Sequence, residues 1–122
     1  MSLQSNLTCI SAEAGSDLSA KQFRFVDMAS DAAVDAVSVA GGDAIGVLQN
    51  DPTAGKAATV AVAGVAKVVA GGAVTAGDRV QSDGNGEALP AASGDIVLGR
   101  ALKGGATGDL IEVLLVSAHV AA

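Results

Sequence analysis

The fold is decided by residues 42–80, which read GDAIGVLQNDPTAGKAATVAVAGVAKVVAGGAVTAGDRV. The apolar stretches in this run are short, and turn residues bound each of them, as where residues 44–48 meet Asn50, Asp51 and Pro52. Stretches of this length between turn residues are typical of strands. Valine favours a sheet, and glycine supplies the positive-φ corners that valine cannot adopt. The run therefore predicts a series of strands that forms a scaffold.

The same pattern continues through most of the chain. Residues 22–28 alternate, which places Phe23 and Phe25 on one face of an expected strand. Asp17 can cap one turn of helix or a loop, and the Asp-Gly and Asn-Gly pairs of residues 82–86 predict a tight hairpin. Further strands are expected at residues 34–39, 44–48, 59–62, 65–69, 78–81, 87–90, 95–102 and 109–116, with Gly64 breaking the run between two of them.

Many short strands and little helix predict an all-β fold of mainly short antiparallel strands, arranged as a small β-barrel or a β-sandwich-like domain. Residues 1–16 are polar and small, with Leu3, Leu7 and Ile10 as isolated apolar points. They are expected to form an extended arm that is ordered only where something holds it. Residues 17–118 are expected to form one β-rich domain, and residues 119–122 a frayed tail.

A Gly-Asp pair precedes an apolar strand four times, at residues 42–43, 77–78, 94–95 and 108–109. Glycine suits a left-handed corner, and the aspartate can accept a hydrogen bond from a nearby backbone N–H. Gly46 and Gly99 instead interrupt apolar strands, which predicts a bulge or a close backbone contact at each.

Composition favours association. Half of the residues are apolar, but the chain has no Trp or Tyr and only two Phe, so Ala and Val must form most of the core. A buried Val contributes only about 1.5 kcal/mol or slightly more, and Ala contributes less. Association of copies would add buried area to this thin core, so an oligomer is expected.

The net charge of −6 disfavours nucleic acid as a partner, because binding phosphates requires a basic surface. Residues 1–55 hold seven acids and two bases, whereas residues 56–122 hold six acids and five bases. The acidic half is expected to face solvent. A single cysteine rules out an internal disulfide framework and is consistent with a reducing compartment. The sequence predicts neither a secretion signal nor a membrane span.

Each candidate for chemistry has a plainer explanation. Residues 83–87 resemble part of a calcium loop but lack its first and twelfth ligands. Lys56 follows Gly55 without the rest of a phosphate loop. Lys67 lies in a strand rather than at the exposed turn of a lipoyl or biotinyl carrier. His119 has no metal-ligand neighbours, and Cys9 has no basic neighbour to lower its pKa. No enzyme activity, catalytic residue, metal or cofactor is expected.

The ordered series of residues nevertheless resembles a known family, the capsid cement (decoration) proteins of tailed bacteriophages. The resemblance covers most of residues 17–116. It is carried by DLSAKQFRFV (17–26), AIGVLQNDP (44–52), Gly55 with AATV (57–60), GVAKVVAG (64–71), AVTAGDRV (73–80), SDGNG (82–86), VLGRAL (97–102) and GDLIEVLL (108–115).

The resemblance implies a structural virion protein on the outer surface of the head, made in the host cytoplasm. It would be a homo-oligomer, expected as a trimer, that bridges major capsid protein subunits and braces the shell against packaged DNA. Leu3, Leu7 and Ile10 of the arm are the expected capsid contacts, through a strand added to an exposed capsid sheet edge. Two alternatives stay open: a head-surface module that binds host-cell or glycan ligands, and a carrier domain that uses Lys67.

Overall fold

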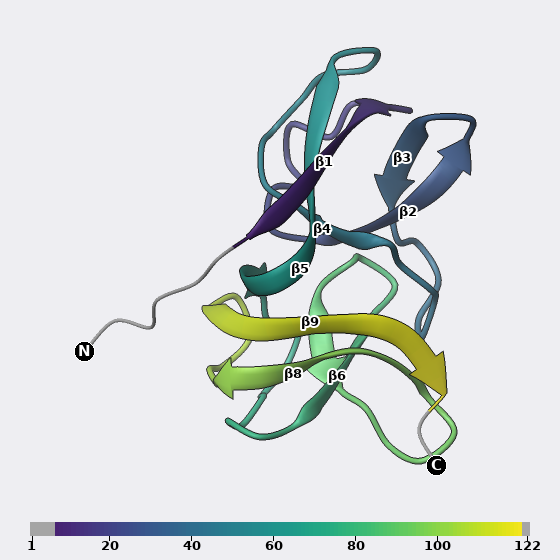
Figure 1. Ribbon diagram of the computed structural model, residues 1–122. Coiled ribbons are helices and arrows are strands. Elements are labelled where there is room, and N and C mark those ends of the chain that lie inside the picture. The colour runs from purple at the N-terminus through teal and green to yellow at the C-terminus, as the bar shows by residue number, and fades with distance from the viewer. Residues whose placement is uncertain (1–6, 121–122) are drawn as a thin grey trace.

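The computed structural model describes residues 7–120, with side chains described through Val116, and over this range it is built of strands and turns without a helix (Figure 1). The all-β prediction is confirmed. The strands are β1 (Thr8–Ala14), β2 (Phe25–Ser30), β3 (Ala33–Ala36), β4 (Gly46–Leu48), β5 (Ala57–Val69), β6 (Arg79–Ser82), β7 (Ala88–Pro90), β8 (Ile96–Lys103) and β9 (Leu110–Val120).

The first five strands form a closed cycle of pairings. β1 pairs with β3, β3 with β2, β2 with β4 and β4 with β5, and β5 pairs back to β1. Only the short contact between β1 and β3 is parallel. The cycle encloses a small apolar core, which consists of Ala14, Leu18, Val26, Val34, Leu48, Ala58 and Val60.

β5 continues into a second group of strands, in the order β5, β9, β8, β6 and β7. A bridge between Ala70 and Ala88 returns from β7 to the residue after β5, so this group also closes. The two groups lie one above the other in Figure 1, and β5 passes from one to the other. The expected break at Gly64 is wrong, because β5 is continuous. Gly64, with φ of 96°, marks the point where β5 exchanges its first partners for β9.

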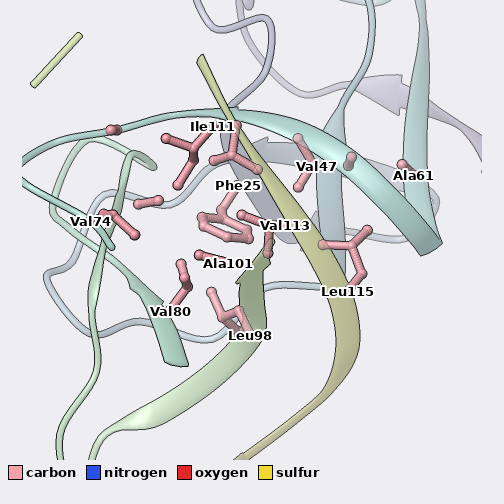
Figure 2. Close-up of a cluster of buried hydrophobic side chains, with 14 of the residues drawn as sticks. Phe25, Val47, Ala61, Val74, Val80, Leu98, Ala101, Ile111, Val113 and Leu115 are labelled. Carbon is pink, nitrogen blue, oxygen red and sulfur yellow. The ribbon is translucent and has the colours of Figure 1, made fainter. Parts of the chain in front are cut away.

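Phe25 joins the two groups. It belongs to β2 of the first group, but its side chain is 1% exposed within the larger core of the second. Figure 2 shows the ring at the centre of that core, among side chains of β6, β8 and β9. Phe25 is the largest of the fully buried side chains. Its labelled neighbours include Val80, Ala101, Ile111 and Val113.

The prediction that Phe23 and Phe25 share one face of a strand is wrong. β2 begins at Phe25, and Phe23 has a left-handed backbone with φ of 64°. Two long-range hydrogen bonds hold it there: its N–H donates to Leu48 O (2.8 Å), and its carbonyl accepts from Val69 N (2.9 Å). The alternation of residues 22–28 cannot predict these hydrogen bonds, because their partners are distant in sequence.

The strand expected over residues 34–39 is displaced. β3 covers Ala33–Ala36, and Val39 lies beyond it with 67% of its surface exposed. Residues 17–22, where one turn of helix or a loop was expected, form turns. There the Asp17 carboxylate accepts a hydrogen bond from Ser19 N at 3.0 Å.

Both ends of the described chain take part in pairing. Residues 8–14 of the expected arm form β1, which β5 holds along Thr8 to Glu13. β9 extends to Val120, so that His119 pairs with Val97. Residues 1–6 and 121–122 of the expected arm and tail lie outside the described residues. The division of the chain into arm, domain and tail stays a prediction.

The predicted turns are largely confirmed. β6 and β7 form the expected hairpin. Three of the four Gly-Asp pairs close the same four-residue turn, with glycine φ values of 96°, 90° and 88° at Gly77, Gly94 and Gly108. In each turn the aspartate carboxylate accepts from the backbone N–H three residues earlier, at 2.8–2.9 Å. The pair at residues 42–43 differs, because the positive φ falls on Gly41.

The two glycines inside apolar strands lie in close backbone contacts, as predicted. A Cβ atom at Gly46 would collide with the carbonyl oxygen of Ala61, and one at Gly99 would meet Val113 Cγ1 and lie 2.7 Å from the carbonyl oxygen of Leu114. Neither position has room for a side chain. These contacts let β4 and β8 approach their neighbours.

Candidate interaction surface

The three residues expected to contact a partner do not form one site in the structure. Leu3 lies outside the described residues. Ile10 is 44% exposed in β1, and Leu7, just before β1, is 39% exposed. Leu7 lines a groove of about 230 Å3 beside Phe23 and Lys67 of β5. The groove thus brings the start of β1 next to the second group of strands, but Ile10 does not line it.

β9 presents apolar side chains on both of its sides, a feature that sequence reasoning missed. Ile111, Val113 and Leu115 enter the core on one side. A strand with one wet side normally alternates apolar and polar residues, so the nearly unbroken apolar run of residues 110–116 was the available signal. The exposed row on the other side consists of Leu110, Leu114 and Val116.

Two arginines lie directly opposite each other beside this row. Arg79 of β6 pairs with Arg100 of β8, and Arg100 pairs in turn with Leu114 of β9. Directly opposed residues project from the same side of a sheet, and like charges in that position are destabilising. Both arginines are exposed, and with Val116 they line a groove of about 140 Å3. An anionic group in this groove would relieve the repulsion.

Two lysines extend the positive charge. Lys67 of β5 and Lys103 of β8 both pair with Glu112 of β9, yet neither forms an ion pair with it. The one ion pair among the described side chains joins Arg24 and Glu87 at 3.7 Å. This surface, here called the basic face, therefore gathers four of the seven cations of the chain without a salt bridge: Lys67, Arg79, Arg100 and Lys103.

The β2–β3 hairpin carries the opposite arrangement. Asp27 pairs directly with Asp35, and both are half-buried. With Asp43 and the exposed side chains of Met28 and Val39 they line a hollow of about 280 Å3, here called the acidic hollow. Again two like charges face each other across a strand pair, here beside apolar side chains.

The other residues considered for chemistry in the sequence lie in turns and strands. Asp83 of the calcium-like loop accepts hydrogen bonds from Asn85 N (2.8 Å) and Glu87 N (2.9 Å), so its carboxylate closes the hairpin. Lys67 lies within β5 rather than at a turn, and Cys9 is an exposed free thiol. No cluster of three or more His, Cys, Asp or Glu side chains suited to a metal occurs in the described part of the chain. No helix able to cross a membrane occurs within residues 7–120.

One carboxylate has a shifted pKa. The Ser19 side chain, and then the Ser19 backbone N–H, hydrogen-bond to Asp17 and lower the pKa of its carboxyl below the ordinary 3.8. Asp17 is fully exposed and lies in the turns after β1. The shift therefore reports local turn structure rather than a buried site.

The geometry defines an all-β domain whose distinguishing features lie on its surface, in two oppositely charged regions edged by exposed apolar side chains. The sequence pattern of phage cement proteins matches residues 11–116. The chain belongs to the phage cement protein family and is a structural protein of the phage head, which confirms the resemblance.

The fold is similar to that of the head fiber gp8.5 N base in bacteriophage phi29, with a TM-score of 0.72. The match covers 96% of this chain and 100% of that chain at 19% sequence identity, and it shows a shared fold. No curated protein sequence matches the chain.

Proposed function

We propose that this protein binds the outer surface of the expanded phage head, bridges major capsid protein subunits and stabilises the shell against the pressure of packaged DNA. The observation that carries the proposal is the family match, which spans residues 11–116 and so includes most of β1 and all of β2 to β8. The role is mechanical and needs no catalysis.

The surface supports a role in bridging. A cement protein must contact several neighbours at once, and this chain has exposed apolar side chains in separate places, including Ile10, Met28 and Leu114. The small side chains of its core also favour association, because assembly buries area that a lone copy leaves in water. A trimer that meets several capsid subunits satisfies both requirements.

The start of the chain is the proposed grip on the shell. β1 pairs with β5 along one edge, whereas its contact with β3 is limited to Glu13 and Ala14. Within residues 7–120 no strand pairs with the opposite edge of residues 8–11, which leaves it available for a further strand, and Leu7 and Ile10 are exposed beside it. An extended capsid segment could bind here through backbone hydrogen bonds.

The test is co-sedimentation of the purified protein with expanded, undecorated heads. Saturable binding at a fixed ratio to the major capsid protein is expected, and a Leu7→Ser/Ile10→Ser variant should bind more weakly. Lys56→Ser is the matched control, because Lys56 is exposed in a turn outside β1. If the protein does not bind heads but binds cells or polysaccharide, the proposal is contradicted and the glycan-binding alternative is favoured.

A further inference from the structure

We propose that the basic face of one copy binds the acidic hollow of a second copy, with the opposed pair Arg79 and Arg100 docked against the opposed pair Asp27 and Asp35. The inference names the contact between copies in the proposed oligomer and therefore rests on that part of the proposed function.

Each of the two surfaces carries a pair of like charges. Arg79 and Arg100 face each other across β6 and β8, and Asp27 and Asp35 face each other across β2 and β3. Each pair is unfavourable in an isolated chain. No described ion pair joins either pair to an opposite charge, so each is left without a salt bridge. A contact that brings the two pairs together removes both repulsions.

The two surfaces also differ in how far their charged side chains are exposed. The arginines are long, exposed side chains, whereas Asp27 and Asp35 are half-buried at the lining of a hollow of about 280 Å3. Guanidinium groups and carboxylates match in geometry and can form two parallel hydrogen bonds. An exposed basic pair and a half-buried acidic pair at a hollow therefore suit each other.

Apolar side chains accompany both pairs. Leu114 and Val116 flank the arginines and are 40% and 39% exposed. Met28 and Val39 flank the aspartates and are 48% and 67% exposed. Their burial would add the hydrophobic area that ion pairs alone do not supply. Because both halves of this match occur on the same chain, a second copy is the partner that the surface specifies.

The contact has a geometric consequence. It joins two different surfaces and is heterologous, so each copy can bind one neighbour through the basic face and another through the acidic hollow. Repetition of such a contact closes a ring when the rotation between copies permits it. A trimer of the proposed kind is a closed ring of this type.

The experiment measures mass in solution by sedimentation velocity. The wild-type chain is expected to form an oligomer, and both Arg79→Glu/Arg100→Glu and Asp27→Arg/Asp35→Arg are expected to sediment as the 11.7 kDa monomer. A chain with both pairs reversed should recover the oligomer. An equimolar mixture of the two reversed chains should associate, because both contacts between unlike chains bring opposite charges together. The two chains must then alternate, so a ring of three should not close, since it would place two copies of the same variant side by side.

Controls separate charge from misfolding. Lys56→Glu makes the same type of charge change at an exposed turn and should leave the mass unchanged. The neutral variants Arg79→Gln/Arg100→Gln and Asp27→Asn/Asp35→Asn carry a smaller electrostatic change and should weaken association less than reversal. Raising the salt from about 0.1 M to about 1 M shortens the screening length from about 10 Å to 3 Å and should weaken association of the wild type.

Three results would overturn the inference. The first is that both reversed variants sediment with the mass of the wild-type oligomer. The second is that the wild type is a monomer at every concentration. The third is that the mixture of the two reversed chains forms no complex. Head binding is measured separately on the same variants. If Arg79→Glu/Arg100→Glu keeps its mass but loses the heads, the basic face meets an acidic capsid surface, and the contact between copies is wrong. If the masses change as expected while wild type ignores heads, the contact stands and the proposed function fails.

Discussion

At the scale of single residues, Phe25 is the side chain on which the larger core depends. Phe25→Ala is expected to reduce the free energy of unfolding by about 3–5 kcal/mol, because it removes a buried ring and leaves a cavity among small neighbours. Phe23→Ala is the control, since Phe23 is only half-buried, and it should cost less than about half as much. Urea unfolding of both variants checks this. Equal losses in the free energy of unfolding would contradict the larger contribution of Phe25 to the core.

The difference between these two residues marks a limit of local sequence reasoning. Their spacing predicts one shared face, and nothing adjacent in the chain argues otherwise. Phe23 turns away because its backbone bonds to Leu48 and Val69, which are distant in sequence. Contacts of this kind depend on the complete fold.

Asp17 gives a prediction about pH. Its pKa in the folded state is lowered, so the stability that it contributes is present above the unfolded pKa near 3.8 and is lost as pH falls through the folded pKa. Ser19→Ala should raise the pKa of Asp17 toward its ordinary value, because the Ser19 hydroxyl is the largest cause of the shift. NMR titration of the Asp17 carboxyl measures this pKa in the wild type and in the Ser19→Ala variant. An unshifted wild-type pKa would contradict the hydrogen bonding described.

At the scale of elements, the three Gly-Asp turns depend on backbone conformation rather than on space. No atom lies within 4 Å of a Cβ built on Gly77, Gly94 or Gly108, but all three have positive φ. Each Gly→Ala substitution is therefore expected to cost roughly 1 kcal/mol from strain alone. Gly84→Ala is the matched control, because Gly84 is exposed without a positive φ and its Cβ would be 3.8 Å from its nearest neighbours. If thermal unfolding showed the same loss of stability for all four Gly→Ala variants, the importance of the positive φ would be contradicted.

At Gly99 a side chain is excluded by lack of space rather than by backbone conformation. The φ of this glycine is not left-handed, but a Cβ would meet Val113 Cγ1 and the backbone of Leu114. Gly99→Ala should therefore destabilise the protein more than any of the three turn substitutions, because β8 and β9 would have to separate. The same unfolding measurements decide this, and a smaller loss than that of Gly77→Ala would contradict the close packing.

The elements were predictable where their signals are local. The hairpin at residues 82–86 and the turns before β6, β8 and β9 were found because glycine and aspartate act within four residues. The continuity of β5 through Gly64 was not found, since a glycine that ends a strand and one that lets it change partners look the same in sequence. Strand pairing depends on contacts far along the chain.

At the scale of the whole molecule, the charge asymmetry between the two halves was visible in the sequence, but the sites within it were not. Arg79 and Arg100 are separated by an entire hairpin, and only the register of β6 against β8 brings them together. Asp27 and Asp35 likewise depend on the pairing of β2 with β3. Leu7 and Ile10 stand out in the sequence because they are isolated apolar residues in a polar segment, and their contact with the capsid stays a prediction.

Binding of this protein is proposed to strengthen the head, and heat-induced release of DNA tests this directly. Filled heads that lack the protein are heated with and without a saturating amount of it, and DNA release is followed with a dye. The release temperature is expected to rise with added protein and to level off at the ratio at which binding saturates. An unchanged release curve on fully decorated heads would contradict this expectation.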